Sequence, residues 1–220
     1  MANILIIGIG GSLGEVFFKG LVEEGNVLYG TSTKRESIAN NVFYLDLTNT
    51  NSIQSFPNIE LDHVIISAGY EPSASLSEST EAHIEKMFRI HVTGPILFLK
   101  KIQSQLSNNS SITFISSPAA WQGSYDPSYA AVKGAVNALV RTLAKDMAPH
   151  TRVNALSPSL IENSTVFNGM THDFKQRHID RTLNKRLLSL DECLQGIKFI
   201  IASPHYTGQI LHLNGGMIYG

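Results

Sequence analysis

The sequence predicts an α/β fold in which helices on both faces cover a doubly wound parallel sheet of about seven strands. Three observations lead to this prediction. Short apolar runs alternate with longer segments of helical periodicity along the 220 residues. The runs are apolar on both faces, as in strands buried on both sides of a parallel sheet. The alternation also favours right-handed crossovers between parallel strands.

Seven brief runs predict the strands, and each is bounded by Gly, Ser, Asn or Pro. Four longer segments predict helices, and in the first of them Phe17 and Leu21 share an apolar face. Only residues 48–62 separate the third and fourth strands, so we expect a helical stub there. The expected strands cover residues 4–7, 27–30, 43–45, 64–67, 112–115, 153–156 and 210–213, and the expected helices cover 13–24, 80–106, 128–147 and 190–201.

Composition favours one globular domain over residues 1–220, because no repeat or linker divides the chain. A net charge of −1 gives no reason to expect nucleic acid or an anionic membrane as a partner. No apolar stretch approaches the ~18–20 residues that span a bilayer. The start lacks the basic residues of a signal peptide. A single cysteine, Cys193, fits a reducing compartment, so we expect a cytoplasmic protein.

The histidine spacing argues against a metal site. His172 and His178 are six residues apart, and His205 and His212 are seven apart. Neither spacing places two ligands on one helix face, so we predict no bound metal.

The first predicted strand runs into a glycine-rich loop that opens a helix. Such a unit lets the backbone approach a pyrophosphate and points the N–H groups of the helix at it. Clustered glycines also occur in plain turns, but this context favours nucleotide binding. The serine in the loop offers a further phosphate contact. The candidate residues are Gly8, Gly10, Gly11, Ser12, Leu13 and Gly14.

The end of the second strand predicts the cofactor. An acid about 20 residues after the glycine loop would bind the ribose 2′-hydroxyl of NAD. The sequence has Thr31, Thr33, Lys34 and Arg35 here, and no acid before Glu36. Hydroxyls and cations suit a 2′-phosphate, which favours NADP (NADPH) over NAD. The alternative is an exposed polar loop with incidental charges.

Tyr129 and Lys133 lie at the start of a predicted helix. Their i, i+4 spacing places both on one face, about 5–6 Å apart at Cβ. A free tyrosine has a pKa near ~10, and a neighbouring ammonium favours its phenolate. Tyr129 is therefore a candidate acid/base for a substrate oxygen, with Lys133 tuning it and bonding the cofactor ribose. This spacing is common in proteins. The position of the pair in the helix after the strand over residues 112–115 is what favours a catalytic role.

That strand ends in Ser116 and Ser117, at the sheet edge where ligand crevices open. A hydroxyl there can bond and polarise a substrate carbonyl. The alternative is that both serines only form the turn.

Together these motifs resemble the classical short-chain dehydrogenase/reductase (SDR) family over essentially the whole chain. The resemblance implies a Rossmann-like fold and an NADP(H)-dependent oxidoreductase acting on a carbonyl or alcohol. Asp46 and Leu47 resemble the pair that contacts adenine, and Ser67, Ala68 and Gly69 resemble the Asn-Asn-Ala-Gly turn. The segment from Pro158 to Ile161 resembles the clamp on the nicotinamide carboxamide, and the tail over 206–216 resembles the closing strand.

Within the family, residues 30–33 and the tail resemble bacterial 3-oxoacyl-[acyl-carrier-protein] reductases, which use NADPH. This likeness implies that Thr33 meets the 2′-phosphate and that the small-molecule substrate is free or carrier-linked. Family members often form homotetramers, so a homo-oligomer, either dimer or tetramer, is expected. Residues 163–185, a polar and weakly periodic stretch, are expected to form a mobile substrate lid.

Two departures from the family leave alternatives open. His91 replaces an asparagine that supports a water leading protons to the lysine. A histidine can handle protons itself, since its pKa is near ~6.5, or it can be packed without a catalytic role. The catalytic serine is Ser117 when aligned from the strand and Ser116 when counted back from Tyr129. We favour Ser117, because the strand fixes the register.

The sequence therefore predicts hydride transfer between nicotinamide and a carbonyl or alcohol, with Tyr129 as acid/base and Ser117 orienting the oxygen. One alternative is a pteridine-type reductase that acts on C=N without the serine. Another is a nucleotide-binding sensor or scaffold that has lost its chemistry. The departures at Ser12, Ser67 and His91 favour the latter, and the intact Tyr–Lys pair argues against it.

Overall fold

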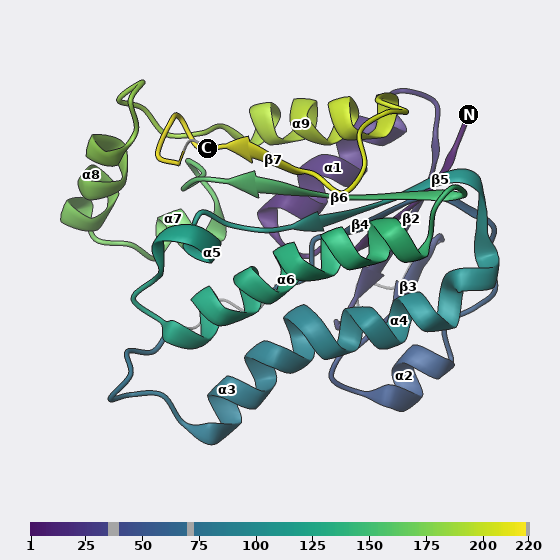
Figure 1. Ribbon diagram of the computed structural model, residues 1–220, viewed down its shortest axis with the longest axis horizontal. Coiled ribbons are helices and arrows are strands. Elements are labelled where there is room, and N and C mark those ends of the chain that lie inside the picture. The colour runs from purple at the N-terminus through teal and green to yellow at the C-terminus, as the bar shows by residue number, and fades with distance from the viewer. Residues whose placement is uncertain (35–39, 70–72, 219–220) are drawn as a thin grey trace.

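A computed structural model describes residues 1–34, 40–69 and 73–218. Seven strands form one sheet in the order β3-β2-β1-β4-β5-β6-β7, and every neighbouring pair is parallel. Helices cover both faces (Figure 1). The predicted doubly wound α/β fold is confirmed.

All seven expected strands are present. The strands β5 and β6 extend further than their apolar runs, because polar residues at their ends also pair with the neighbouring strand. Ser67, expected as a strand end, lies just after β4. The strands are β1 Asn3–Ile7, β2 Val27–Ser32, β3 Val42–Tyr44, β4 Leu61–Ile66, β5 Leu106–Ile115, β6 Thr151–Pro158 and β7 Ile210–Leu213.

The strand order reverses direction at β1, which lies between β2 and β4. In a doubly wound sheet, the crevice for a ligand opens at such a point, outside the carboxyl ends of the strands. The loops after β1, β4 and β5 end at this edge. The predicted site residues on these loops are Gly8, Gly10, Gly11, Ser67, Ala68, Gly69 and Ser117.

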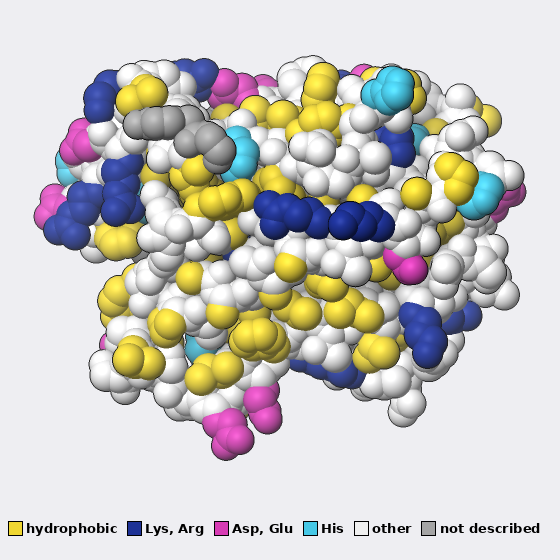
Figure 2. Space-filling model, in the orientation of Figure 1, with side chains coloured by type: hydrophobic (Ala, Val, Ile, Leu, Met, Phe, Trp, Pro, Cys, Tyr) yellow, Lys and Arg dark blue, Asp and Glu magenta, His cyan; other side chains and the backbone are white. Residues whose placement is uncertain are grey.

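Two helices, α1 Ser12–Val22 and α9 Leu190–Ala202, cover one face of the sheet. The other face carries α4 Gly94–Ile102 and α6 Pro127–Asp146, with α2 Thr50–Gln54 as the expected stub. Hydrophobic side chains gather on the outward surface over α3 Glu81–Phe88, α4 and α6 (Figure 2). None of the helices in the described ranges is long and apolar enough to cross a membrane.

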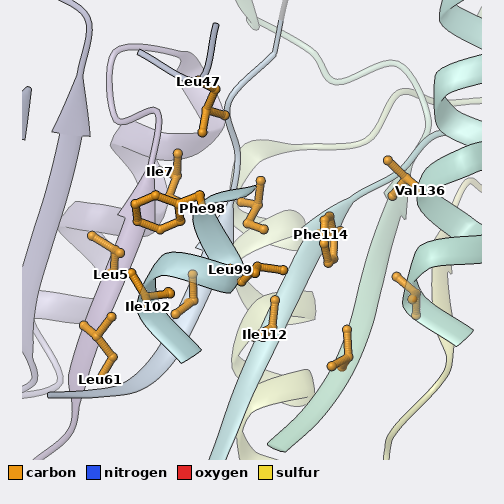
Figure 3. Packing of buried hydrophobic residues seen from close by; sticks show 14 of the residues in the cluster. Leu5, Ile7, Leu47, Leu61, Phe98, Leu99, Ile102, Ile112, Phe114 and Val136 are labelled. Atoms are coloured by element: carbon orange, nitrogen blue, oxygen red, sulfur yellow. The ribbon is translucent and has the colours of Figure 1, made fainter. Parts of the chain in front are cut away.

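The larger core lies between the sheet and α4 and α6. Phe98 and Ile102 of α4 lie beside Ile7 and Leu5 of β1 (Figure 3). Leu99 extends toward Ile112 and Phe114 of β5. On the other face, α1 and α9 bury a second apolar cluster that includes Cys193, which is fully buried. Burial on both faces explains why the strands are apolar throughout.

The expected helix over residues 80–106 is not continuous. The structure divides it into α3, a π-helical turn Arg89–Thr93, α4 and a 3-10 turn Gln103–Gln105. Pro95 has no N–H to donate to the preceding turn, so a regular α-helix cannot run through this point. The apolar periodicity of the segment did not contain this information.

The segment over residues 163–185 contains two helices that the sequence did not predict. These are α7 Thr165–Asn168 and α8 His172–Arg181, each with a serine or threonine as N-cap. A further short helix, α5 Ala119–Gln122, precedes α6. In Figure 1, α8 lies beyond the tips of β6 and β7.

The glycine loop gives a test of the fold. A Cβ on Gly14 would lie 2.2 Å from the carbonyl oxygen of Gly8, whereas a Cβ on Gly10 would meet nothing within 4 Å. We expect Gly14→Ala to lower the free energy of unfolding by about 1–3 kcal/mol, as overpacking does. Gly10→Ala, the matched control, leaves it nearly unchanged. Urea denaturation measures both, and equal stability of the two variants would contradict this close packing.

Candidate active site

The carboxyl edge of the sheet opens into a cavity of about 640 Å³. Of the residues that the sequence predicts for the site and the structure describes, all except Gly14 line this cavity. Gly14 instead packs against the backbone of Gly8. Arg35, also considered for the 2′-phosphate, lies outside the described residues.

The glycine loop is held against two neighbouring strands. Gly8 has φ +90°, and a Cβ on it would lie 2.7 Å from the Cα of Ala68. The Gly8 N–H donates to the hydroxyl of Thr31 at 3.1 Å, and the Ile9 N–H donates to the Thr31 carbonyl at 3.0 Å. Thr31 is buried. The Thr31 hydroxyl therefore holds the glycine loop in place. The sequence predicted a cofactor contact for Thr31 but not this structural role.

The loop fits a pyrophosphate group. A Cβ on Gly10 or Gly11 would meet nothing within 4 Å, so the backbone at both positions faces open space at the cavity. Gly11 is the N-cap of α1 and supplies no side-chain cap. Because glycine has no side chain, no N-cap side chain accepts the first N–H groups of α1, which suit an anionic ligand.

Ser12 is already engaged within the protein. Its hydroxyl oxygen accepts the Thr165 N–H at 3.0 Å and lies 3.0 Å from the Thr165 hydroxyl. The Ser12 hydroxyl thus links the glycine loop to α7, and the expected phosphate contact from it stays a prediction. Thr165 is a site residue that the sequence reasoning missed, because nothing local to it indicates a contact 153 residues away.

The far end of the cavity lies beside β2 and β3. Thr33 and Lys34 are exposed there, and the Lys34 N–H donates to the hydroxyl of Ser32 at 3.0 Å. Asp46 accepts the N–H and the hydroxyl of Thr48 through its Oδ1, at 2.8 and 2.7 Å. Leu47 is buried beside it. The turn after β3 is thus fixed in place.

Lys133 is buried, and its Nζ donates to the carbonyl oxygen of Ile115 at 2.8 Å. The Nζ lies 5.4 Å from the centre of the Tyr129 ring. Burial lowers the pKa of Lys133 to about 8. The end of β5 therefore holds a cation beside Tyr129 whose proton is more easily released than that of a free lysine.

His91 lies in the π-helical turn and is buried. Its ring centre is 6.3 Å from that of Tyr129, in an edge-to-face arrangement. A Cβ on Gly69 would come within 3.6 Å of the His91 Cε1. The ring thus lies between the turn after β4 and Tyr129. Isolated π-turns often occur at functional sites, which suits this placement.

The two serines differ in their surroundings. Ser116 is 2% exposed, and its hydroxyl donates to the Asn137 Oδ1 at 2.6 Å. Ser117 is partly exposed, and its hydroxyl oxygen accepts the Ala119 N–H at 3.2 Å. The hydroxyl proton of Ser116 is therefore used in a bond within the protein. Among the described residues, the Ser117 hydroxyl only accepts a hydrogen bond, so its proton remains available for donation into the cavity. This geometry favours Ser117.

Asp126 is a positioning residue that the sequence reasoning missed. It is fully buried and caps α6, accepting the N–H groups of Ser128 and Tyr129 at 2.8 and 3.1 Å. It also accepts the Ser128 hydroxyl and lies 2.8 Å from the His83 Nε2. An aspartate directly before Pro127 is a readable helix-start signal.

Burial alone would raise the pKa of Asp126, but the hydrogen bonds from Ser128, Tyr129, His83 and Ala74 outweigh it and lower the pKa to about 2. A buried carboxylate thus holds the backbone of Tyr129.

The described ranges contain no group of three or more His, Cys, Asp or Glu side chains that could hold a metal ion.

Known proteins share this doubly wound fold. A family model described as enoyl-(acyl carrier protein) reductase matches residues 29–218. Short-chain dehydrogenase/reductase SDRA of Arabidopsis thaliana is 31% identical over 164 residues, 72% of this chain and 64% of that protein. A dihydromonapterin reductase of Klebsiella pneumoniae is 31% identical over 139 residues, 60% of this chain and 56% of that protein. The chain thus matches less than two thirds of the length of these relatives.

Solved structures share the fold across the entire chain. A glucose/ribitol dehydrogenase-type SDR from Brucella melitensis has a TM-score of 0.90 at 24% identity, covering 100% of this chain and 97% of its own. A small-chain dehydrogenase in complex with NADPH has a TM-score of 0.86 at 24% identity, and the match covers 100% of this chain and 99% of that chain. The chain belongs to the short-chain dehydrogenase/reductase family, whose members are oxidoreductases that bind a nicotinamide cofactor and act on small molecules.

The Asp126 carboxylate leads to a stability prediction. Its pKa in the folded protein, about 2, is below the ordinary value of 3.8, so its contribution is present above about pH 4 and is lost as the pH falls through about 2. We expect Asp126→Asn to lower the free energy of unfolding at pH 7 by on the order of 2 kcal/mol.

The matched control is Asp146→Asn, an exposed residue at the other end of α6. It should change stability by less than about 0.5 kcal/mol. Urea denaturation between pH 2 and 7 measures both variants. If Asp126→Asn keeps the acid-induced loss of the wild type, the carboxylate does not have this role.

Proposed function

We propose that the protein transfers hydride between NADP(H) and a carbonyl or alcohol substrate, with Tyr129 as the acid/base. The observation that carries this proposal is the meeting, in one cavity, of Tyr129, Lys133 and Ser117 with the open backbone of the glycine loop. A sensor or scaffold has no need of a buried lysine held beside a tyrosine.

When bound, the nicotinamide supplies or accepts the hydride. Tyr129 gives its hydroxyl proton to the substrate oxygen during reduction and takes it back during oxidation. Ser117 donates a hydrogen bond to the same oxygen, which stabilises the charge that develops there. Lys133, fixed by the Ile115 carbonyl, favours the phenolate that Tyr129 leaves. His91 contacts the Tyr129 ring, and we assign it a supporting part in proton handling.

The remaining predicted residues are assigned to the cofactor. Gly10 and Gly11 are assigned to the pyrophosphate. As the family resemblance implies, Asp46 and Leu47 are assigned to the adenine. Pro158 and Ile161 are assigned to the nicotinamide carboxamide on the same ground. Thr33 and Lys34 support NADPH over NADH, since both are exposed at the cavity and β2 ends without an acid up to residue 34. The solved relative in complex with NADPH is consistent with this choice.

Reduction of a C=N bond is the second candidate, favoured by the likeness to a dihydromonapterin reductase. A pteridine nitrogen is basic enough to be protonated without a serine hydroxyl polarising an oxygen. The two candidates therefore differ in how strongly turnover depends on Ser117.

We also propose that residues 163–185 act as the substrate lid. Two contacts support this: Ser12 holds Thr165 of α7, and the Lys175 Nζ of α8 lies 4.1 Å from the centre of the Phe167 ring. The expected homo-oligomer, dimer or tetramer, is supported by Ile84 and Phe88 of α3 and Ile96 of α4, which are 38–40% exposed. Hydrophobic side chains gather over these helices in Figure 2. A cytoplasmic location stays a prediction from the sequence.

The catalytic assignment is tested by substitution. With NADPH and a panel of ketones and aldehydes, Tyr129→Phe should lower kcat by about 100-fold or more, since acid–base groups contribute 10²–10⁴-fold. Ser117→Ala should lower kcat strongly, and Ser116→Ala, the matched control, much less. A Ser117→Ala variant with wild-type turnover would favour C=N reduction, and a Tyr129→Phe variant with wild-type turnover would overturn the mechanism.

The cofactor assignment is tested by fluorescence titration with NADPH and NADH. A charge-assisted contact to the 2′-phosphate should make NADPH bind about 10-fold or more tightly. Lys34→Ala should narrow this difference, whereas Lys145→Ala, an exposed lysine of α6 outside the cavity, should not. Equal affinities of the wild type, or tighter NADH, would contradict the assignment.

A further inference from the structure

The helix α8 places three side chains in the cavity that contains Tyr129. Phe174, His178 and Arg181 follow i, i+4, i+7 spacing, so they lie on one face of the helix, and all three line the cavity. This end of the cavity lies beyond β6 and β7, on the opposite side from the predicted adenine site beside β3. The family motifs named above do not include these residues.

The charges that line the cavity are distributed unevenly. Among its described lining residues, the cations are Lys34, Lys133 and Arg181, and the single carboxylate is Asp46. Asp46 follows β3 at the far end, where it accepts hydrogen bonds from Thr48. Lys133 donates to the Ile115 carbonyl. The α8 end therefore has a cation and no facing carboxylate among the described lining residues.

Arg181 differs from Arg152 and Arg186, whose side chains have partners within the protein. Arg186 pairs with Glu192 at 2.6 and 2.8 Å, and Arg152 donates to three backbone carbonyls. The side chain of Arg181 makes no hydrogen bond or ion pair with any residue in the described ranges. Its guanidinium keeps its five donors, in a planar arrangement that matches two oxygens of an anion. Lys and Arg side chains also gather on the surface around α8 (Figure 2).

His178 lies one helical turn before Arg181. Its Nδ1 is buried and has no hydrogen-bond partner within the described part of the chain. Burial, and then the charge of Arg181, lower the pKa of His178, so the neutral ring prevails at pH 7. A buried nitrogen without a partner costs about 1–3 kcal/mol, and a ligand oxygen accepting from it would remove that cost.

Apolar side chains share the cavity with this pair. The His178 ring centre is 5.4 Å from that of Phe174, and Val166, Met170 and Met217 also line the cavity. A ligand that packs against the apolar side chains and hydrogen-bonds to Arg181 and His178 has an apolar body and an anionic end.

We propose that Arg181 and His178 form a subsite for an anionic oxygen group, a carboxylate or a phosphate, at the end of the substrate remote from the reacting carbonyl or alcohol. The apolar side chains of α7 and α8 hold the intervening part of the substrate. This inference rests on the proposed function for the identity of the reacting carbonyl or alcohol. The binding of an anion by Arg181 and His178 does not depend on that function.

The direct test is calorimetric titration of the NADP⁺-loaded protein with straight-chain carboxylates from butanoate to octanoate. The matching amides provide neutral controls, and alkyl phosphates of equal length distinguish the two anions. We expect at least one chain length at which an anion binds about 10-fold or more tightly than its amide, as charge-assisted hydrogen bonds provide. Equal binding of acids, phosphates and amides at every length would overturn the proposal.

Three variants identify the residue responsible. Arg181→Gln should weaken anion binding about 10-fold or more and leave the amides unaffected, and Arg181→Lys should restore part of the loss. Arg177→Gln is the matched control, because Arg177 is an exposed arginine of the same helix that does not line the cavity. Equal losses in Arg177→Gln and Arg181→Gln would mean general attraction to the basic surface and would overturn the subsite. Thermal melting confirms that each variant is folded.

Turnover separates failure of the subsite from failure of the proposed function. Oxo acids and their methyl esters are compared as substrates with NADPH. Arg181→Gln should raise KM for the acid about 10-fold or more, with kcat and the ester little changed. If no carbonyl is reduced but Arg181-dependent anion binding remains, the reaction is wrong and the subsite stands. If carbonyls are reduced without regard to Arg181 or the charge of the substrate, the subsite is wrong and the reaction stands.

Discussion

The site depends on a close approach of backbone to backbone at the point where the strand order reverses. Gly8 packs against the Cα of Ala68, and Gly14 packs against the carbonyl of Gly8, so neither position has room for a side chain. These contacts hold the loop after β1 against the turn after β4. The crevice outside the sheet then opens where Gly10 and Gly11 have nothing within 4 Å, and the start of α1 faces it.

A second set of contacts fixes the residues to which we assign the reaction beside that crevice. Asp126 holds the N-terminus of α6 and with it the backbone of Tyr129. The Ser116 hydroxyl and the Lys133 ammonium join α6 to the end of β5 through Asn137 and the Ile115 carbonyl. Tyr129 therefore stands on a helix held at its cap and along its side, as a preorganised acid/base requires. The partly exposed Ser117 is free to face a ligand because Ser116 carries the structural bond.

Sequence alone predicted the seven strands, the sheet type and the gathering of the motif residues in one cavity, because these follow from periodicity and from the carboxyl edge of a parallel sheet. It did not predict the π-helical turn that places His91 against Tyr129, since apolar spacing does not reveal how a helix accommodates Pro95. It also missed the partners of Ser12 and Thr31, which depend on contacts between distant segments. The helices α7 and α8 were missed because the segment that contains them has few apolar residues, although their serine and threonine caps were readable.

The most direct measurement of the central claim follows deuterium from NADPH labelled at C4 of the nicotinamide into the products of a carbonyl panel, by NMR. We predict deuterium on the carbon that bears the new hydroxyl group, delivered by the wild-type protein and nearly absent from the Tyr129→Phe products. Binding of NADPH without transfer of the label to any carbonyl carbon would contradict the account.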